Sequence, residues 1–329
     1  MSKPTLVVEQ LKTQFFSRAG TTKAVDDVSF SVLPGEIMGL VGESGCGKSM
    51  TGYSIMGLID PPGKVVGGSI RLMGEELRGL SQDKMRAIRG NRIAMIFQDP
   101  MMTLNPVLRI DTQMTEAIFA HQKKVSARMA RAMVRDALVR VGIASPDERL
   151  LAYPHQFSGG MRQRVAIAIA LLNKPDLIIC DEPTTALDVT IQAQILYEMQ
   201  KLCRESGTAL IWITHDLSVV ASLADKVCVM YAGKVVESGT VHNVLAYPRH
   251  PYTDGLISCA PSRNVPGQPL MQIPGMTPSL LNLGGGCAFR ERCHRATDVC
   301  LKVPPLEKLQ GGRELRCFAP NILEEETVA

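Results

Sequence analysis

Residues 39–58 read GLVGESGCGKSMTGYSIMGL, and their pattern points to one class of fold. It begins as an apolar strand, turns through a loop with three glycines, and continues into a helical pattern. Gly42, Gly45 and Gly47 let the loop turn its backbone amides toward an anion, because side chains at these positions would block the approach. The order of strand, loop and helix predicts a phosphate-binding loop at a helix N-terminus.

The residues that complete this loop fit a nucleoside triphosphate. Lys48 supplies a positive charge for the β and γ phosphates, and Ser49 supplies a hydroxyl for Mg²⁺, as in a Walker A motif. The thiol of Cys46 is either reactive near the helix N-terminus or simply a tolerated small residue. The predicted nucleotide-binding residues of this loop are Gly42, Glu43, Ser44, Gly45, Cys46, Gly47, Lys48, Ser49 and Met50.

An acidic pair ends a second apolar run, DLIICDE at 176–182. Asp181 fits a Walker B carboxylate that holds Mg²⁺ through its water shell, and Glu182 fits a base that orients or deprotonates an attacking water. Alone, such a pair indicates only a surface strand end, so the upstream phosphate loop is what favours the Mg²⁺ interpretation. His215 ends the next apolar run in WITHD, where we predict that its imidazole reaches the γ-phosphate.

The pattern along the chain predicts a parallel sheet covered by helices over residues 1 to about 250. The expected strands lie in the runs 36–42, 92–98, 176–182, 209–216 and 226–233. Strand signals disappear between Asn105 and Ser158, where helical periodicity predicts an insertion. Beyond His250, frequent proline and glycine and a loss of periodicity predict a linker into a small cysteine-bearing tail.

Composition narrows the class of protein. The 329 residues are 45% hydrophobic, and the net charge of +4 favours an ordinary soluble surface over a nucleic-acid footprint. The N-terminus lacks the apolar core of a signal peptide, and the longest apolar helical stretch, 165–172, is too short to span a bilayer. We therefore expect a cytoplasmic protein that meets a membrane only through a partner or through its surface.

A second phosphate-binding feature is predicted within FSGGMRQRVAIAIALL, residues 157–172. Ser158, Gly159 and Gly160 open a helix with exposed backbone donors, an arrangement that attracts phosphate and also serves as an ordinary helix cap. With these residues in hand, the chain resembles the nucleotide-binding subunits of ATP-binding cassette transporters. Six motifs follow the family order: Walker A at 42–49, Gln98, FSGGMRQ at 157–163, Walker B at 177–182, ALD at 186–188, and His215.

This resemblance implies an α/β P-loop NTPase fold with a RecA-like core, an antiparallel β subdomain, a helical subdomain and a small Cys-rich C-terminal extension. It implies an ATPase domain over 1–255, with its helical insertion at about 105–158, and a C-terminal domain over 256–329. It further implies that Ser158–Gly160 bind the γ-phosphate of an ATP held by the P-loop of a second subunit. Each ATP is then sandwiched between two chains.

The resemblance also implies roles for single residues. Gln98 senses the γ-phosphate. Gln98, Ser49 and Asp181 together bind Mg²⁺, and Asp188 touches the P-loop of the opposite subunit. An aromatic residue before the loop stacks on adenine. Phe15 is preferred over Phe16 for that stacking, and an apolar packing role remains an alternative for both.

Four stretches narrow the resemblance to the dipeptide and oligopeptide importer branch: 95–106, 181–196, 230–239 and 248–256. This branch implies a motor subunit at the cytoplasmic face of the inner membrane. Its implied partners are a second, distinct ATPase, two permease subunits and, indirectly, an extracytoplasmic binding protein, with no nucleic acid. Nickel and glutathione are alternative substrates. A soluble cassette that acts on nucleic acid or ribosomes, and a regulatory cassette that barely hydrolyses ATP, are alternative functions.

Four clustered cysteines characterise the tail. Cys287, Cys293, Cys300 and Cys317 are separated by five, six and sixteen residues, and four converging thiolates suit zinc or an iron–sulfur cluster. Zinc ribbons favour two-residue gaps, and the resemblance implies a [4Fe-4S] cluster, with Zn²⁺ or unligated thiols as alternatives. Because the tail has few apolar residues of its own, we expect the metal to support its folding.

Overall fold

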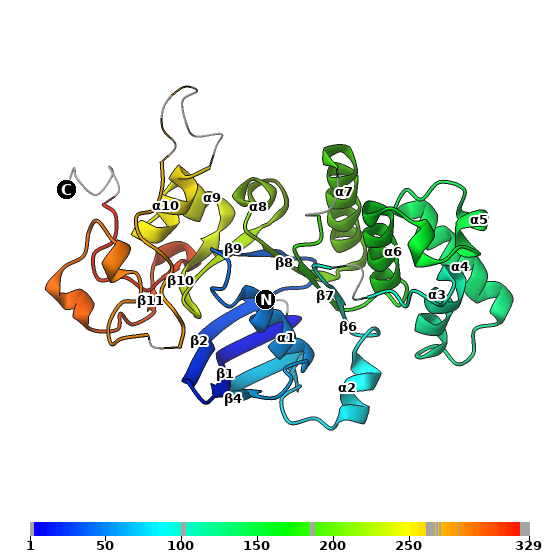
Figure 1. Cartoon of the computed structure of the whole chain (residues 1–329), viewed down its shortest axis with the longest axis horizontal. Coiled ribbons are helices and arrows are strands. Elements are labelled where there is room, and N and C mark those ends of the chain that lie inside the picture. Colours follow the sequence, from blue (N-terminus) through cyan, green and yellow to red (C-terminus); the bar gives the residue numbers. More distant parts are fainter. Residues whose placement is uncertain are drawn as a thin grey trace. The chain divides into compact units, whose positions relative to one another are not determined.

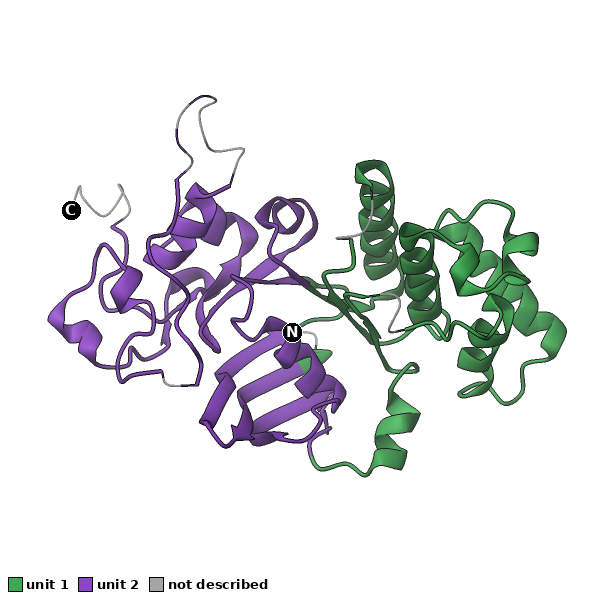
Figure 2. Cartoon of the chain, in the orientation of Figure 1, with its two compact units in different colours: residues 1–6, 32–37, 79–212 green, residues 7–31, 38–78, 213–329 purple. Residues whose placement is uncertain are grey.

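The computed structural model describes residues 3–99, 103–184, 188–260, 267, 269, 271–281 and 283–322. The chain divides into two compact units that each combine strands with helices (Figure 2). Unit 1 comprises residues 1–6, 32–37 and 79–212, and unit 2 comprises residues 7–31, 38–78 and 213–329. Among the described residues, none of the helices has both the length and the apolar character needed to cross a membrane.

Unit 1 contains β6 (Ile93–Ile96), β7 (Leu177–Asp181) and most of β8 (Ala209–Thr214), with six of the ten α-helices that the structure describes (Figures 1 and 2). Strand β6 runs parallel to β7, and β8 is the next neighbour of β7. All residues of these strands are buried, which explains their continuous apolar sequences. The helices are α2 (Gln82–Ile88), α3 (Ile110–Phe119), α4 (Ala127–Arg140), α5 (Pro146–Leu150), α6 (Gly159–Leu171) and α7 (Val189–Ser206), with the short 3₁₀ helix η2 (Pro154–Gln156).

The interval 105–158 is helical. Helix α4 packs against α3 and α6, and Ala130, Val134, Ala137 and Leu138 form its buried face. These positions recur at helical spacing, so the apolar stripe lies on one side. The side chain of Ser126 caps α4 by accepting a hydrogen bond from the amide of Met129.

Unit 2 begins with a sheet of order β2-β1-β4-β5. Its strands are β1 (Leu6–Ser17), β2 (Gly20–Val32), β4 (Gly63–Leu72) and β5 (Glu75–Glu76). Only two residues join β1 to β2, so this pair is an antiparallel hairpin, and β4 and β5 are antiparallel as well. An antiparallel β sheet is therefore present in the N-terminal part of the chain, as the resemblance implies.

A second group of strands in unit 2 includes the C-terminal tail. Strand β3 (Ile37–Val41) is parallel to β9 (Lys226–Tyr231), and β10 (Lys234–Thr240) is antiparallel to β9. The tail strand β12 (Glu314–Leu315) pairs with β10, and β11 (Glu307–Lys308) pairs with β12. The helices of unit 2 are α1 (Lys48–Met56), α8 (Leu217–Leu223), α9 (Val241–Ala246) and α10 (Pro251–Ser258), with the 3₁₀ helices η4 (Arg290–Arg292), η5 (Asp298–Leu301) and η6 (Gln310–Gly312).

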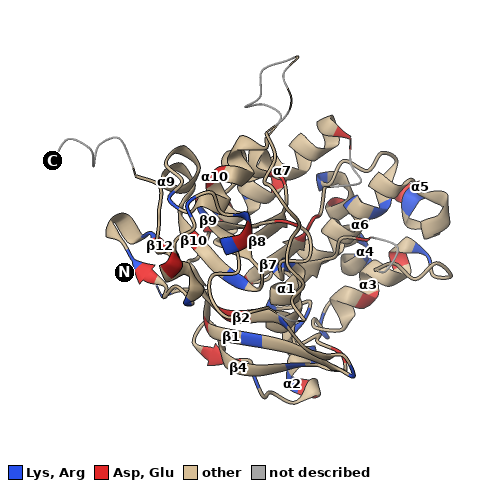
Figure 3. Ribbon diagram, turned by 60° about the vertical axis from the view of Figure 1, so that its left-hand side comes forward, with Lys and Arg blue, Asp and Glu red and all other residues tan. Residues whose placement is uncertain are grey.

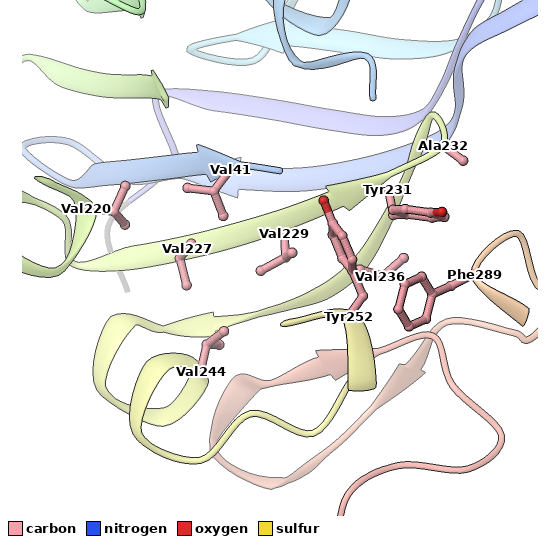
Figure 4. Close-up of a cluster of buried hydrophobic side chains, with 10 residues drawn as sticks. All are labelled: Val41, Val220, Val227, Val229, Tyr231, Ala232, Val236, Val244, Tyr252 and Phe289. Carbon is pink, nitrogen blue, oxygen red and sulfur yellow. The ribbon is translucent and has the colours of Figure 1, made fainter. Parts of the chain in front are cut away.

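A buried aromatic cluster joins the tail to the strands of unit 2 (Figure 4). The rings of Tyr231 and Tyr252 have centroids 4.6 Å apart, and Phe289 lies 5.2 Å from Tyr231 and 5.3 Å from Tyr252. Phe289 lies between Cys287 and Cys293 in sequence and is buried. The tail therefore gains apolar support from β9 and α10, which its own composition does not predict.

The expectation that periodicity ends at His250 is wrong. Residues 251–258 form helix α10, which the imidazole of His250 caps by accepting a hydrogen bond from the amide of Tyr252 at 3.0 Å. Pro251 occupies the first helical position, where its missing N–H costs nothing. An eight-residue helix with a proline and a glycine is too short to give a clear periodic signal.

Candidate functional site

The glycine loop connects β3 to α1 within unit 2, as the sequence predicts. Gly42, Gly45 and Gly47 have positive φ angles of 149°, 78° and 104°. A Cβ on Gly42 would lie 2.2 Å from the backbone oxygen of Met230, and a Cβ on Gly47 would lie 2.2 Å from that of Ala24. The loop is therefore pressed against neighbouring backbone at two positions, where a side chain has no room.

The middle of the loop faces open space instead. Among the described residues other than Gly45 and its two chain neighbours, none has an atom within 4 Å of the position of a Cβ on Gly45. Gly47 is the N-cap of α1. Because glycine has no side chain, it cannot cap the amides in the first turn of this helix. Backbone donors at an open helix N-terminus suit an anion.

The amine of Lys48 spans the loop. Lys48 is buried, and its Nζ donates to the backbone oxygen of Gly42 at 2.8 Å and to that of Glu43 at 3.0 Å. Cys46 is fully buried, and burial raises the pKa of its thiol despite the opposing charge of Lys48. The tolerated small residue is therefore the interpretation of Cys46 that the structure favours over a reactive thiol.

Within unit 1, two predicted catalytic side chains meet. Gln98 Nε2 donates to Glu182 Oε2 at 3.2 Å, although 84 residues separate them. Asp181 is buried as the last residue of β7, and Glu182 follows it with φ of 47°. This left-handed backbone conformation is strained for a non-glycine residue, and such strain is typical of functional sites.

The Ser-Gly-Gly turn begins helix α6 as expected. Ser158 Oγ accepts a hydrogen bond from the amide of Met161 at 3.3 Å, so this serine caps its own helix. Apart from its chain neighbours and the backbone of its own helix, none of the described residues has an atom within 4 Å of the position of a Cβ on Gly159. The turn is therefore a helix cap that also leaves room for a ligand at Gly159. Its local geometry fits both predictions, an ordinary helix cap and a phosphate-binding helix N-terminus.

Asp188 caps helix α7. Its carboxylate accepts hydrogen bonds from the Ile191 amide at 3.0 Å and from the Thr190 hydroxyl at 2.8 Å. The hydrogen bond from Ile191, followed by that from Thr190, lowers the pKa of Asp188. Residues 186 and 187 of the ALD motif and residues 100–102 of the stretch after Gln98 lie outside the described residues.

The remaining predicted ligands of the nucleotide belong to unit 2. Phe15 lies against Gly63, since a Cβ there would be 2.6 Å from its ring, whereas Phe16 is 44% exposed. His215 follows β8 and lines a cavity of about 950 Å³ with residues of α8 and α10.

Lys and Arg are interspersed with Asp and Glu over the ribbon (Figure 3), in keeping with the small net charge.

Three of the four tail cysteines have raised thiol pKa values. Burial, followed by the charges of the other cysteines, raises the pKa of Cys317 to about 11, and burial likewise raises the pKa of Cys287 and Cys293. The Cys287 amide donates to the backbone oxygen of Cys300 at 2.9 Å. As placed, the side chains of the described residues form no group of three or more His, Cys, Asp or Glu that could hold a metal ion.

Three side chains that the sequence does not single out contact the phosphate loop. Arg292 and Thr277 donate hydrogen bonds to the carboxylate of Glu43, and the hydroxyl of Tyr252 accepts one from its amide. Arg292 precedes Cys293 directly, and this proximity to a cysteine is the one sequence signal near it. Contacts across more than 200 residues leave no local pattern.

Comparison with known proteins defines the class. The ABC transporter family matches residues 25–185, and the oligopeptide/dipeptide transporter C-terminal region matches residues 236–300. The chain belongs to the ABC transporter ATP-binding family. It is 50% identical to the dipeptide transport ATP-binding protein DppD of Bacillus subtilis, over 98% of this chain and 97% of that protein.

Two further relatives support this assignment. The chain is 46% identical to the oligopeptide transport ATP-binding protein OppD of Escherichia coli, over 96% of this chain and 93% of that protein. Its structure resembles that of a dimeric ATP-binding cassette in a post-hydrolysis state with ADP and phosphate, with a TM-score of 0.66 and 26% identity over 72% of this chain and 98% of that chain. The cassette fold expected from the motifs is confirmed.

Proposed function

We propose that this protein is the ATP-hydrolysing motor subunit of a membrane importer for dipeptides or oligopeptides. The observation that carries the proposal is the glycine loop, whose backbone excludes side chains at Gly42 and Gly47 while leaving Gly45 open. Identity of 46–50% with peptide-transport ATP-binding proteins over nearly the whole chain supports the substrate class. We further propose residues 1–255 as the ATPase domain and 256–329 as the C-terminal domain.

The proposed chemistry assigns each group a role from its position. The amides of residues 42–50 bind the phosphates, and Lys48 exchanges carbonyl partners for phosphate oxygens. Bound Mg²⁺, held through Ser49, Gln98 and Asp181, would neutralise phosphate charge. Glu182 takes a proton from the attacking water, and Gln98, which already donates to Glu182, orients that carboxylate. His215 contacts the γ-phosphate, and Phe15 stacks on adenine.

The proposed working state is a pair of cassettes. Ser158, Gly159 and Gly160 on one subunit contact the γ-phosphate held by the P-loop of the other, and Asp188 touches that P-loop. The dimeric relative with bound ADP and phosphate supports this arrangement. The partners would be a second ATPase subunit and two permease subunits at the cytoplasmic face of the inner membrane, with a binding protein acting indirectly.

We also propose that Cys287, Cys293, Cys300 and Cys317 hold a [4Fe-4S] cluster. The support for this proposal is the number and type of the ligands, because four cysteine thiolates are the set that such a cluster uses. Visible absorbance and iron content of the purified protein test this proposal. Stoichiometric zinc in a colourless protein would assign Zn²⁺ instead, and neither metal would leave the thiols unligated.

The decisive experiment on the proposed function replaces Glu182 by Gln. This variant keeps the shape of the side chain and removes its basicity, so we expect it to bind ATP, dimerise and stop hydrolysis. Glu205→Gln, an exposed change on α7, is the matched control and should hydrolyse ATP at the wild-type rate. Full turnover by Glu182→Gln would contradict the assigned base. Uptake of labelled peptides, with nickel and glutathione as competitors, tests the substrate.

A further inference from the structure

The phosphate loop contains an acidic residue that the cysteine-bearing tail neutralises. Arg292 forms a two-pronged ion pair with Glu43, with Nη1 at 2.7 Å from Oε2 and Nη2 at 2.9 Å from Oε1. The hydroxyl of Thr277 donates to the same Oε2 at 2.7 Å. Burial alone would raise the pKa of Glu43, but the hydrogen bonds from Arg292 and Thr277 outweigh it and lower that pKa.

Arg292 is itself fixed in place. Its side chain is 7% exposed, Nε donates to the backbone oxygen of Pro274 at 2.9 Å, and Nη1 lies 3.3 Å from the hydroxyl of Tyr231. The guanidinium lies 5.9 Å from the ring centroids of both Tyr231 and Phe289. A planar, preorganised guanidinium that is hydrogen-bonded and packed beside two rings has little freedom to follow a moving carboxylate.

The contact continues into the phosphate site through Glu43. The backbone oxygen of Glu43 accepts a hydrogen bond from Lys48 Nζ at 3.0 Å, and its amide donates to the Tyr252 hydroxyl at 2.8 Å. The same residue thus holds the tail through its side chain and the phosphate-binding lysine through its backbone. A shift of Glu43 would displace the carbonyl that positions the Lys48 amine.

Charge gives this pair a second consequence. A carboxylate on a loop built for polyphosphate repels the ligand, and an opposite charge in direct contact reduces that repulsion. Loss of Arg292 would therefore both loosen the loop and expose a negative charge beside the phosphates. The two effects act in the same direction on nucleotide affinity.

We propose that Arg292 is a positioning residue for the nucleotide site and couples nucleotide binding to docking of the tail segment 287–301. This inference rests on the proposed binding of ATP at the glycine loop. Coupling is reciprocal by thermodynamic linkage, so nucleotide bound at the loop stabilises the docked tail to the same degree that the docked tail improves affinity.

The first test compares Arg292→Met with Arg290→Met in the full-length protein. Arg290 lies in the same 3₁₀ turn and pairs with Glu291 at 3.8 Å, so its loss removes the same charge without touching the loop. We expect Arg292→Met to raise the Kd for Mg·ADP and the KM for ATP about tenfold, with kcat within about twofold, and Arg290→Met to change neither. Arg292→Lys, which keeps the charge but loses the two-pronged geometry, should fall between them.

A double-mutant cycle isolates the route through Glu43. If Arg292 acts through this carboxylate, Glu43→Gln combined with Arg292→Met weakens Mg·ADP binding less than the sum of the single changes. Additive losses, or an Arg292→Met affinity within twofold of Arg290→Met, would overturn the inference. Should Arg292→Met fail to fold, Arg292→Lys and the exchange measurement that follows decide the question.

The reciprocal measurement uses hydrogen exchange of amides in residues 287–301. Mg·ADP should slow this exchange in the wild-type protein and in Arg290→Met. In Arg292→Lys, Mg·ADP should slow it less. Lys48→Ala separates the two hypotheses. Equal binding of ADP by wild type and Lys48→Ala would refute the proposed function, whereas normal wild-type binding with unchanged exchange would refute only the coupling.

Discussion

The hydroxyl of Tyr252 offers a sharp test of how helix α10 supports the phosphate loop. Tyr252 is fully buried, and its oxygen accepts the Glu43 amide at 2.8 Å. In Tyr252→Phe the ring keeps its packing against Tyr231 and Phe289, but the amide loses its acceptor. An unsatisfied buried donor costs about 1–3 kcal/mol, which corresponds to an unfolding constant raised about 5- to 150-fold.

Urea denaturation followed by circular dichroism measures this loss. Tyr247→Phe is the control, because Tyr247 is 52% exposed and a substitution at such a surface position changes stability by less than about 0.5 kcal/mol. We expect a lower midpoint for Tyr252→Phe with an unchanged slope. If its free energy of unfolding equalled that of Tyr247→Phe, the hydrogen bond would contribute nothing and the structural role assigned to this hydroxyl would be wrong.

Three further predictions follow from the packing of unit 2. Gly47→Ala should be far more destabilising than Gly45→Ala in thermal melts, because both have positive φ, costing about 1–2 kcal/mol, but only Gly47 also meets backbone at 2.2 Å. Arg313→Met should destabilise by about 3 kcal/mol in urea, since it removes the buried partner of Glu237, and a loss below 1 kcal/mol would contradict this. Burial lowers the pKa of His250 to about 3, so the unfolded chain binds the extra proton between pH 6.5 and 3. The free energy of unfolding therefore decreases as the pH is lowered through that window, by up to about 1.4 kcal/mol for each pH unit. His250→Asn retains a capping oxygen and should flatten this pH dependence in urea titrations.

The five strands β3, β6, β7, β8 and β9 were predictable because each is a short run of mostly apolar residues. The runs at 92–98, 176–182 and 226–233 are rich in β-branched and other apolar residues, and they form β6, β7 and β9 as predicted. Buried parallel strands need apolar residues on both faces, so the run itself carries the information. The glycines of the phosphate loop were equally readable, because each marks a backbone shape that other residues resist.

The role of the tail was not predictable from its own sequence. Glu43 and Arg292 stand 249 residues apart, and an ion pair at that separation produces no periodicity or local motif. Helix α10 was missed for a related reason, since its cap and packing partners decide its structure more than its eight residues do. In both cases the deciding contacts are tertiary.

The pairing of β12 with β10 has a consequence for synthesis on the ribosome. Strand β10 ends at Thr240, whereas its partner begins at Glu314, so roughly 75 more residues must be made before that edge is covered. At about 5–20 residues per second, the unpaired edge persists for roughly 4–15 s in each nascent chain. During that interval the newborn cassette presents an open template for strand addition, and a stop codon shortly before residue 314 would make this aggregation-prone state permanent.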